Sequence, residues 1–302
     1  MRCLVLADAL AAAGWDCAFA CNAEAGETVP GVRRYDLLES IDGRWDLAVV
    51  DHYGLDAEYE GGLRGKARSI LVIDDIHDRR HDCDLLLDQT LGRMADDYAG
   101  LLPEGCRMLL GPAHALLRPE FAEHRKRSLA RRRGAVECIL LGFGATDPHN
   151  LTALAMRELA DWGAAINVVL GKGAPHLEQV RALAGGSFTL HVNPPAMAGL
   201  MAAADLAIGT PGITSWERCT LGLPAILIAI ADNQRQIAAE LHKIGAVVDL
   251  GGHETLNADE ISHTVEALCG DSAALTHMAE AAASVCDGQG TDRVVVALSE
   301  IM

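Results

Sequence analysis

Residues 209–234 contain the amino acids whose types and order point most directly to chemistry. Glycines flank Pro211, and a short helix is expected to begin at Thr214 or Ser215. Backbone N–H groups at such a helix N-terminus attract phosphate, and Glu217, one turn into the helix, can accept hydrogen bonds from a ribose. This order predicts a site for a nucleotide diphosphate.

The same segment continues into a buried apolar strand, expected at Ala225–Ile230, which leads to a polar strand end at Asp232 and Asn233. In open α/β sheets, ligands collect at the carboxyl ends of strands. However, a glycine before a helix and a glutamate in a first turn also occur in α/β proteins that bind no nucleotide. Taken alone, the segment leaves both interpretations open.

A second glycine-bearing loop, Gly142-Phe143-Gly144, follows the strand expected at Glu137–Leu141. Glycines let the backbone approach a ligand closely, although a lone Gly-x-Gly is a weak signal. Because both loops fall in the same half of the chain, they are predicted to hold the nucleotide together.

Polar side chains also follow two strands in the first half of the chain, expected at Leu47–Val50 and Ser69–Ile73. These side chains could supply acid–base and hydrogen-bonding groups at one edge of a sheet. The alternative is that the acids cap helices and the histidine is an ordinary half-exposed residue. The residues concerned are Asp51, His52, Tyr53, Asp74 and Asp75.

The tract His77–Asp84 alternates histidine, aspartate, arginine and cysteine and resembles a metal-binding sequence. It is short and lacks the helical spacing of a His-x-x-x-His site, so a polar loop with local salt bridges is the better prediction. We therefore expect neither a metal nor another cofactor.

Composition limits the partners. The chain has 302 residues and a formal net charge of −17, which opposes nucleic acids and anionic membranes. The basic run Arg125–Arg133 is expected to be the solvated face of a linker helix. The nine cysteines form no CxxC pair, and no export signal or membrane-spanning run is recognisable, so a reducing cytoplasm is expected. The sequence gives no signal for oligomeric state.

Apolar strands alternate with helical patterns along the whole chain, which predicts an α/β protein of two doubly wound, Rossmann-like domains that face each other across a cleft. The polar, basic segment near 122–135 separates the two runs. The predicted domains are residues 1–130 and residues 131–302, the second with C-terminal helices.

The first residues form a ready-made helix, Arg2–Ala13, ended by Gly14, with no strand before it. In a doubly wound domain the first strand is normally central. Either the sheet order is rearranged, or the first strand of this domain is missing because the chain begins too late.

Short motifs spread in order over nearly the whole chain resemble one family, the UDP-2,4-diacetamido-2,4,6-trideoxy-β-L-altropyranose hydrolases of pseudaminic acid biosynthesis. Each motif is weak alone, but together they are specific. The matching pieces are Val50-Asp-His-Tyr-Gly54, Ile73-Asp-Asp-Ile76, His81-Asp-Cys-Asp-Leu-Leu-Leu-Asp-Gln89, Leu110-Gly111-Pro112, Phe143-Gly-Ala-Thr-Asp147, Thr214-Ser-Trp-Glu-Arg-Cys219, Asp232-Asn-Gln234 and Asp287-Gly-Gln-Gly290.

The resemblance implies a glycosyltransferase-B-like fold whose second domain holds UDP and whose first domain supplies the hydrolytic site. It implies attack of water on the anomeric carbon with loss of UDP and inversion, without a required metal, in a cytoplasmic pathway that serves flagellin glycosylation. Glu217 would hold the ribose, and Tyr53 and Asn233 would approach the sugar. The backbones expected at the diphosphate are those of Gly142, Phe143, Gly144, Gly212, Ile213, Thr214 and Ser215. The sugar side would include Asp51, Asp74, Asp75, Asp232 and Gln234.

One departure from the family pattern concerns the general base. The family usually opens with a strand and a Gly-x-Gly-His-x-x-Arg-Cys loop, and this chain starts at Met1-Arg2-Cys3, just past that histidine. We therefore expect the native start to lie upstream. The 302-residue form is expected to bind UDP with little or no hydrolysis, and His52 is the substitute base that the sequence offers.

Two rival functions remain open at this stage. A glycosyltransferase of the same architecture would share the UDP-binding half but would need an acceptor site, for which no exposed apolar or basic patch is recognisable. A noncatalytic binder of nucleotide sugars is the third possibility. In each case the predicted partner is a small UDP-sugar.

Overall fold

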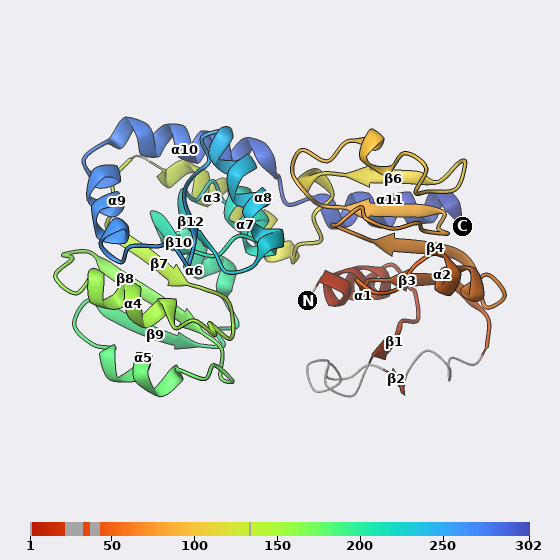
Figure 1. The fold of residues 1–302 in the computed structure, drawn as a ribbon, viewed down its shortest axis with the longest axis horizontal. Coiled ribbons are helices and arrows are strands. Elements are labelled where there is room, and N and C mark those ends of the chain that lie inside the picture. The colour runs from red at the N-terminus through yellow and green to blue at the C-terminus, as the bar shows by residue number, and fades with distance from the viewer. Residues whose placement is uncertain (1, 22–32, 37–42, 133) are drawn as a thin grey trace. The chain divides into compact units, whose positions relative to one another are not determined.

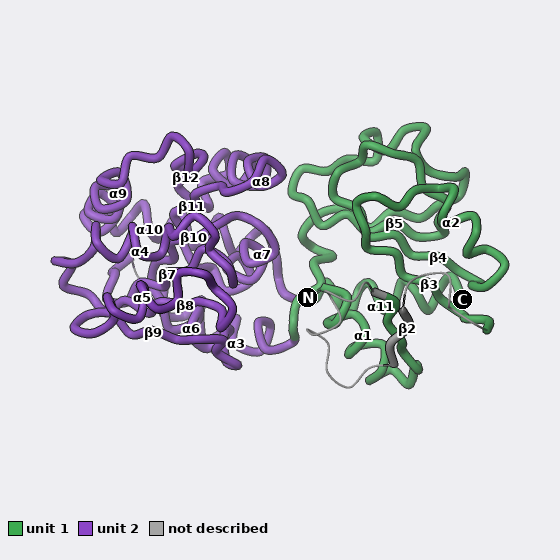
Figure 2. The backbone as a smooth tube through the Cα atoms, turned by 60° about the horizontal axis from the view of Figure 1, so that its bottom comes forward, with its two compact units in different colours: residues 1–118, 289–302 green, residues 119–288 purple. Residues whose placement is uncertain are grey.

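The computed structural model describes residues 2–21, 33–36, 43–132 and 134–302. The chain divides into two compact units, which Figure 2 shows in separate colours. Unit 1 consists of residues 1–118 and 289–302, and unit 2 consists of residues 119–288. Each unit has its own sheet and its own apolar core, so each is described by itself.

Unit 1 contains a four-stranded parallel sheet in the order β3-β4-β5-β6 and a separate parallel pair, β1-β2. Figure 1 shows the helix α11, from the C-terminal end of the chain, beside these strands. The elements of unit 1 are α1 (Arg2–Ala12), β1 (Ala18–Cys21), β2 (Arg33–Asp36), β3 (Trp45–Val50), α2 (Ala57–Leu63), β4 (Ala67–Ile73), β5 (Leu85–Asp88), the 3₁₀ helix η2 (Ala95–Tyr98), β6 (Arg107–Leu110), η3 (Pro112–His114) and α11 (Gly290–Ile301).

Successive residues of β4 point to opposite faces of the sheet, and each face has its own apolar cluster. Leu71 packs into one cluster together with Leu6 of α1 and Leu298 of α11. Ile70 packs into the other, together with Tyr98. Full burial of one such aliphatic side chain contributes about 1.5–3 kcal/mol relative to its exposure. Both faces of β4 are thus buried from Ile70 to Ile73, where its sequence is continuously apolar.

Unit 2 contains a six-stranded parallel sheet in the order β12-β11-β10-β7-β8-β9. Its elements are α3 (Pro119–Arg131), β7 (Cys138–Gly142), α4 (Leu151–Glu158), β8 (Ala165–Leu170), α5 (Leu177–Leu183), β9 (Phe188–Val192), α6 (Met197–Ala203), β10 (Leu206–Gly209), α7 (Ile213–Thr220), β11 (Ala225–Ala229), α8 (Asp232–Lys243), β12 (Val247–Gly252), α9 (Asp259–Cys269) and α10 (Ser272–Val285).

The strand order of unit 2 runs outward from β7 and β10 in opposite directions, so right-handed crossovers place the connecting helices on opposite faces of the sheet. The helix α4 contacts α5 and α9, while α7 contacts α3 and α10. This is the doubly wound arrangement predicted from the alternating strands and helices. The point where the order reverses lies between β7 and β10, where such folds bind ligands.

The boundary between the units differs from the expected one. We predicted domains of residues 1–130 and 131–302, but the helix α3 belongs entirely to unit 2 and α11 belongs to unit 1. Arg125 of α3 donates to the backbone oxygens of Thr220 and Cys286, both in unit 2. Conversely, Val294 and Leu298 of α11 pack into the unit 1 core. Arg125 of the basic run therefore binds backbone oxygens of unit 2 and does not belong to a solvated linker.

The expected helix at the start of the chain is α1, which ends one residue earlier than predicted. Among the described residues, β3 pairs with β4, and β1 pairs with β2 in a ladder of its own. The elements β2 and α2 were not predicted. In the described part of the chain, no helix has the length and apolar character needed to cross a membrane.

Candidate functional site

The carboxyl ends of β3 and β4 bring Asp51 and Asp75 together, because the two strands are adjacent and parallel, with Val50 paired to Val72. Arg2, at the start of α1, binds both acids. Its Nε and Nη2 donate to the two oxygens of Asp51 at 3.0 and 2.6 Å, and its Nη1 donates to Asp75 Oδ2 at 3.0 Å. We call these three residues the Arg2 cluster.

Arg2 and Asp51 are both charged at neutral pH. Burial disfavours the charge on Arg2, but hydrogen bonds to Asp51 and the charges of both acids outweigh it and raise the pKa of Arg2. Burial also disfavours the charge on Asp51, and Arg2 again outweighs it, so the pKa of Asp51 is lowered. The Cys3 thiol donates to Asp51 Oδ2 at 3.0 Å. The result is a bidentate, charge-assisted contact that holds the acids at the strand ends.

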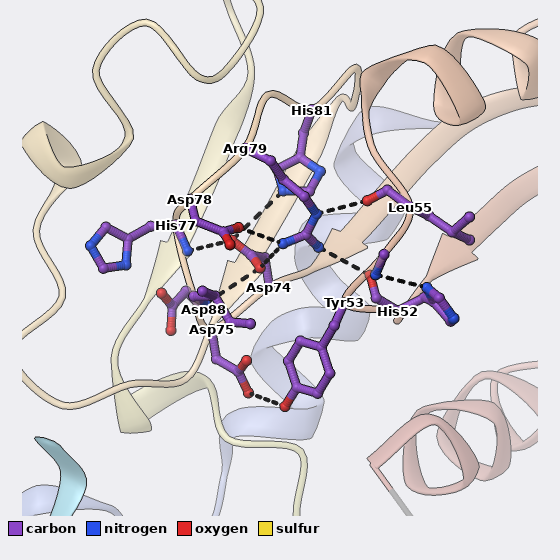
Figure 3. A network of polar contacts seen from close by, with 12 residues as sticks. His52, Tyr53, Leu55, Asp74, Asp75, His77, Asp78, Arg79, His81 and Asp88 are labelled. Atoms are coloured by element: carbon purple, nitrogen blue, oxygen red, sulfur yellow. Dashed lines mark hydrogen bonds and ion pairs between the residues drawn. The ribbon is translucent and has the colours of Figure 1, made fainter. Parts of the chain in front are cut away.

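Tyr53 is the exposed member of this region. Its side chain is 55% exposed, and its hydroxyl lies 3.5 Å from Asp75 Oδ2 (Figure 3). Burial and the nearby charge of Asp75 raise the pKa of Tyr53, so the phenol stays protonated and can donate. The other oxygen, Asp75 Oδ1, is buried without a hydrogen-bond partner among the described residues. Such an acceptor calls for a donor from water or a ligand.

His52 points away from the Arg2 cluster. Its Nδ1 accepts the backbone N–H of Gly54 at 2.9 Å, and its ring lies on an exposed turn (Figure 3). Its backbone oxygen accepts from Arg79 Nη2 at 3.0 Å. The structure therefore brings Asp51, Tyr53 and Asp75 together but not the His52 ring.

Asp74 was predicted on the sugar side, and the structure buries it instead, with 1% exposed. Its oxygens accept from the backbone N–H of His77 at 2.9 Å, from Arg79 Nη1 at 3.1 Å and from the Tyr98 hydroxyl at 3.0 Å. These donors outweigh the effect of burial and hold the pKa of Asp74 well below its usual range. Asp74 thus anchors the loop that follows β4, because His77 and Arg79 of that loop donate to its carboxylate.

Three residues that the sequence did not single out complete this support. The Tyr98 hydroxyl lies 2.9 Å from Asp88 Oδ2 as well as close to Asp74, so it bridges the acids at the ends of β5 and β4. Arg93 bonds to Asp88 through Nε and donates from Nη2 to the backbone oxygen of Asp75 at 3.1 Å. Asp88 lies in a stretch that matches the family, but no spacing marks Arg93 or Tyr98.

The predicted polar loop His77–Asp84 is confirmed as a loop with local ion pairs, such as Arg79 with Asp78. His81, within it, is buried: its Nδ1 lies 2.8 Å from Glu60 Oε1 and its Nε2 lies 3.7 Å from Asp74 Oδ2. Burial disfavours the charged ring, but Asp74 and Glu60 outweigh it and raise the pKa of His81 to about 9. In the residues that the structure describes, no group of three or more His, Cys, Asp or Glu side chains suits a metal ion.

In unit 2, the helix α7 begins directly after the glycine turn at the end of β10. Its N-cap residue is Gly212, with φ of 136°, and no side chain caps the helix. The Ser215 N–H donates to the Gly212 oxygen at 2.8 Å, and no side chain caps the N–H groups that precede it, which is the geometry that favours a bound anion. Glu217 is half-buried in the second turn.

A buried arginine holds this turn in place. Arg218 of α7 is 5% exposed and donates from Nη2 to the Thr210 backbone oxygen at 2.7 Å and to Ser215 Oγ at 3.2 Å. Burial lowers the pKa of Arg218 to about 10, so the guanidinium remains charged at neutral pH. The sequence reasoning missed this residue, although it lies within the matching piece Thr214–Cys219. Its charge adds to the positive potential at the helix N-terminus.

The two predicted glycine loops are neighbours, because β7 and β10 pair with Gly142 opposite Gly209. A β-carbon on Gly209 would stand 2.3 Å from the Gly142 carbonyl oxygen. The Phe143 side chain is fully buried in the core, so its backbone is what remains for a ligand. Gly144 has φ of +88° and open space around it. The structure thus brings together the loops that the sequence paired.

Asp232 and Asn233 were expected as a polar strand end, but β11 ends at Ala229 and both residues open the helix α8. Asp232 is fully exposed, with Arg235 Nε at 3.3 Å from its Oδ1. Gln234 turns back, and its Oε1 accepts the Ile230 backbone N–H at 2.9 Å. Gln234 therefore closes the turn into α8, while Asp232 and Asn233 face solvent at the helix start.

No protein-family model matches the chain. An uncharacterized protein of Methanocaldococcus jannaschii is 26% identical over 212 residues, 67% of this chain, and the match spans 44% of that protein's length. UDP-2,4-diacetamido-2,4,6-trideoxy-beta-L-altropyranose hydrolase of Campylobacter jejuni is 26% identical over 218 residues, which cover 71% of this chain and 78% of that protein. Spore coat polysaccharide biosynthesis protein SpsG of Bacillus subtilis is 25% identical, over 65% of this chain and 59% of its own length.

Solved structures show the fold. MurG of Acinetobacter baumannii superposes with a TM-score of 0.65 at 17% identity and covers 99% of this chain and 95% of its own. A putative UDP-N-acetylglucosamine 2-epimerase of Listeria monocytogenes gives 0.57 at 11% identity, over 84% of this chain and 74% of that one. The predicted glycosyltransferase-B-like fold, with two Rossmann-like domains, is thereby confirmed.

Proposed function

We propose that this chain, which belongs to the family that includes UDP-2,4-diacetamido-2,4,6-trideoxy-β-L-altropyranose hydrolase, binds a UDP-sugar and hydrolyses its bond to UDP. A role with nucleotide sugars follows from that family and from the fold together. The observation that carries the proposal is the uncapped N-terminus of α7 beside the Gly142–Gly144 loop, at the point where the strand order of unit 2 reverses.

The nucleotide is assigned to unit 2. Of the predicted backbone Gly212–Ser215, the N–H groups of Gly212, Ile213 and Thr214 would donate to the diphosphate, since the Ser215 N–H donates to the Gly212 oxygen. Arg218 would hold the turn in place. The backbone of the Gly142–Gly144 loop would approach from the adjacent strand. Glu217 would accept hydrogen bonds from the ribose hydroxyls. Support for this assignment comes from the convergence of two glycine turns and a buried cation at one edge of one sheet.

The acid–base groups are assigned to unit 1. We assign the proton acceptor to Asp75 rather than to His52. The Asp75 carboxylate is part of the Arg2 cluster, and its Oδ1 has no hydrogen-bond partner among the described residues, whereas the His52 ring accepts from the backbone of Gly54. Tyr53, which donates toward Asp75, would contact the sugar, and Asn233, a residue of unit 2, is also assigned to the sugar. Arg2 and Arg93 hold the Asp75 side chain and backbone in place.

The reaction is a displacement at the anomeric carbon. An oxygen of water forms the new bond to that carbon as its proton passes to Asp75, and the bond to the UDP oxygen breaks with its electron pair leaving on UDP. The products are UDP and the free sugar. Since UDP is already a competent leaving group, positioning of water and donors for the departing charge are the main requirements.

The proposal is tested with UDP-2,4-diacetamido-2,4,6-trideoxy-β-L-altropyranose in buffer without an acceptor, with UDP release as the readout. The sequence alone predicted little or no hydrolysis, but with Asp75 as the proton acceptor we instead expect UDP release by the unaltered chain. Asp75→Asn should lower the rate roughly 10²–10⁴-fold and retain UDP affinity. The matched control is Asp96→Asn, the same change at an exposed acid in η2.

Two outcomes would contradict the proposal. If UDP appears only when an alcohol acceptor is added, the chain is a glycosyltransferase. If the protein binds UDP but the UDP-sugar releases UDP at the same rate with and without protein, the chain is a noncatalytic binder. In addition, full activity in Asp75→Asn together with its loss in His52→Ala would move the proton acceptor to His52.

A further inference from the structure

Two cysteines stand side by side where β5 and β6 begin. Cys83 lies two residues before β5, Cys106 lies directly before β6, and their sulfur atoms are 3.6 Å apart. The backbone keeps them adjacent, because the Arg107 N–H donates to the Asp84 oxygen at 3.0 Å at the start of the β5–β6 ladder. Both thiols are free.

The two thiols differ in environment. Cys83 is 1% exposed and belongs to the apolar cluster with Ile70 and Tyr98, whereas Cys106 is half-buried at the edge of that cluster. Their mutual hydrogen bond, and then burial, raises the pKa of Cys83, while the same bond lowers the pKa of Cys106. Cys106 is therefore the sulfur that both reaches solvent and ionises more readily, which are the requirements for an attacking thiol.

We propose that Cys83 and Cys106 form a reversible disulfide when the protein meets a small-molecule disulfide such as oxidised glutathione. The Cys106 thiolate attacks one sulfur of the oxidant, so that a mixed disulfide forms and one glutathione thiolate leaves. Cys83 then gives up its proton and attacks the Cys106 sulfur, the mixed disulfide breaks, and a second glutathione leaves. The two protein thiols are oxidised together, and one glutathione disulfide is reduced to two thiols.

The disulfide would close residues 83–106 into a loop. That loop contains Asp88, Arg93 and Tyr98, whose contacts support the end of β4 and the backbone of Asp75. A crosslink that fits the native geometry stabilises the fold mainly by restricting the unfolded chain. The expected consequence is a supporting segment that resists unfolding more strongly when it is oxidised.

The sequence provides a clean assay. Trypsin cleavage after Arg80, Arg93 and Arg107 places Cys83 in residues 81–93 and Cys106 in residues 94–107, each as the single cysteine of its peptide. The folded chain is equilibrated at set ratios of oxidised to reduced glutathione, quenched in acid, alkylated and digested. We expect the two peptides to be linked at oxidising ratios, to separate on reduction, and to remain unlinked in Cys106→Ser. Cys17→Ser, another partly buried thiol, serves as the matched control and should leave the link intact.

Thermal unfolding of the same samples gives an independent readout. We expect the midpoint of the oxidised wild-type chain to lie several degrees above that of the reduced chain, and no such shift in Cys106→Ser. Recovery of both peptides unlinked and alkylated at every ratio would overturn the proposal. So would a glutathione adduct on residues 94–107 that never resolves, or a linked form whose midpoint is unchanged or lower, since its geometry would not be native.

Discussion

Gly209 lies so close to Gly142 that a β-carbon on Gly209 would stand 2.3 Å from the Gly142 carbonyl oxygen. The two glycine loops of unit 2 are therefore packed backbone to backbone. We predict that Gly209→Ala destabilises the fold by about 1–3 kcal/mol, because the obstructing atom belongs to the backbone and cannot rotate away. Chemical denaturation measures the change. Gly173→Ala, where nothing lies within 4 Å of the added carbon, is the matched control. Equal stability of the two variants would contradict the close approach.

The Tyr98 hydroxyl bridges two buried acids, Asp74 and Asp88. Tyr98→Phe removes the single hydroxyl hydrogen that the two acids share and leaves the shape of the ring unchanged. We predict a loss of about 1–3 kcal/mol in the free energy of unfolding. Tyr59→Phe is the control, since the Tyr59 hydroxyl is buried without a hydrogen-bond partner among the described residues. If both variants lose the same stability, the bridge has no energetic role.

His81 predicts a pH dependence of stability. Its pKa in the folded chain is raised to about 9, above the ordinary value of 6.5. Because the pKa of His81 is higher in the folded chain than in the unfolded chain, protonated His81 stabilises the fold fully below pH 6.5. This stabilisation is lost as the pH rises from about 6.5 through 9. The loss should be on the order of 1–3 kcal/mol. Unfolding measured from pH 6 to pH 9.5 should show this decline in the wild-type chain but not in His81→Gln, and parallel curves would refute the assignment.

Arg218 is predicted to support UDP binding by holding the Thr210 turn. A lysine keeps the charge but cannot reach both the Thr210 oxygen and Ser215 Oγ in the same fork geometry. We expect Arg218→Lys to weaken UDP binding roughly tenfold, about 1.4 kcal/mol by titration calorimetry. Arg235→Lys, at an exposed site near the start of α8, should leave the affinity unchanged. An unaltered affinity in Arg218→Lys would show that the turn does not need its anchor.

The sequence was most informative where local pattern and structure coincide. The apolar run predicted as a strand at Ala225–Ile230 is β11, which ends one residue earlier, because a strand buried on both faces must be apolar throughout. The glycine turns could also be predicted, because side chains do not fit there. A β-carbon on Gly209 would clash with the Gly142 oxygen, and Gly212 has a positive φ that other residues rarely adopt. The two glycine loops were predicted to act together because they lie in the same half of the chain, and the structure places them at the ends of paired strands.

What remained unpredicted depends on contacts between distant residues. Arg93 reaches the backbone of Asp75, 18 positions away, and nothing in the spacing marks that bond. Asp74 and Asp75 are adjacent and chemically identical, yet only the turn after β4 decides that the first is buried and the second is not. Likewise, the apolar stripe of α11 does not say which core it joins, so the last helix was placed with the wrong unit.

Hydrolysis in water enriched in oxygen-18 tests the central claim most directly, because it reports which bond of the UDP-sugar breaks. Attack of water at the anomeric carbon leaves the original bridging oxygen on the nucleotide. The account therefore predicts that the released UDP, analysed by mass spectrometry, carries no oxygen-18. Release of UDP that carries the heavy isotope would place the attack at phosphorus and contradict the account.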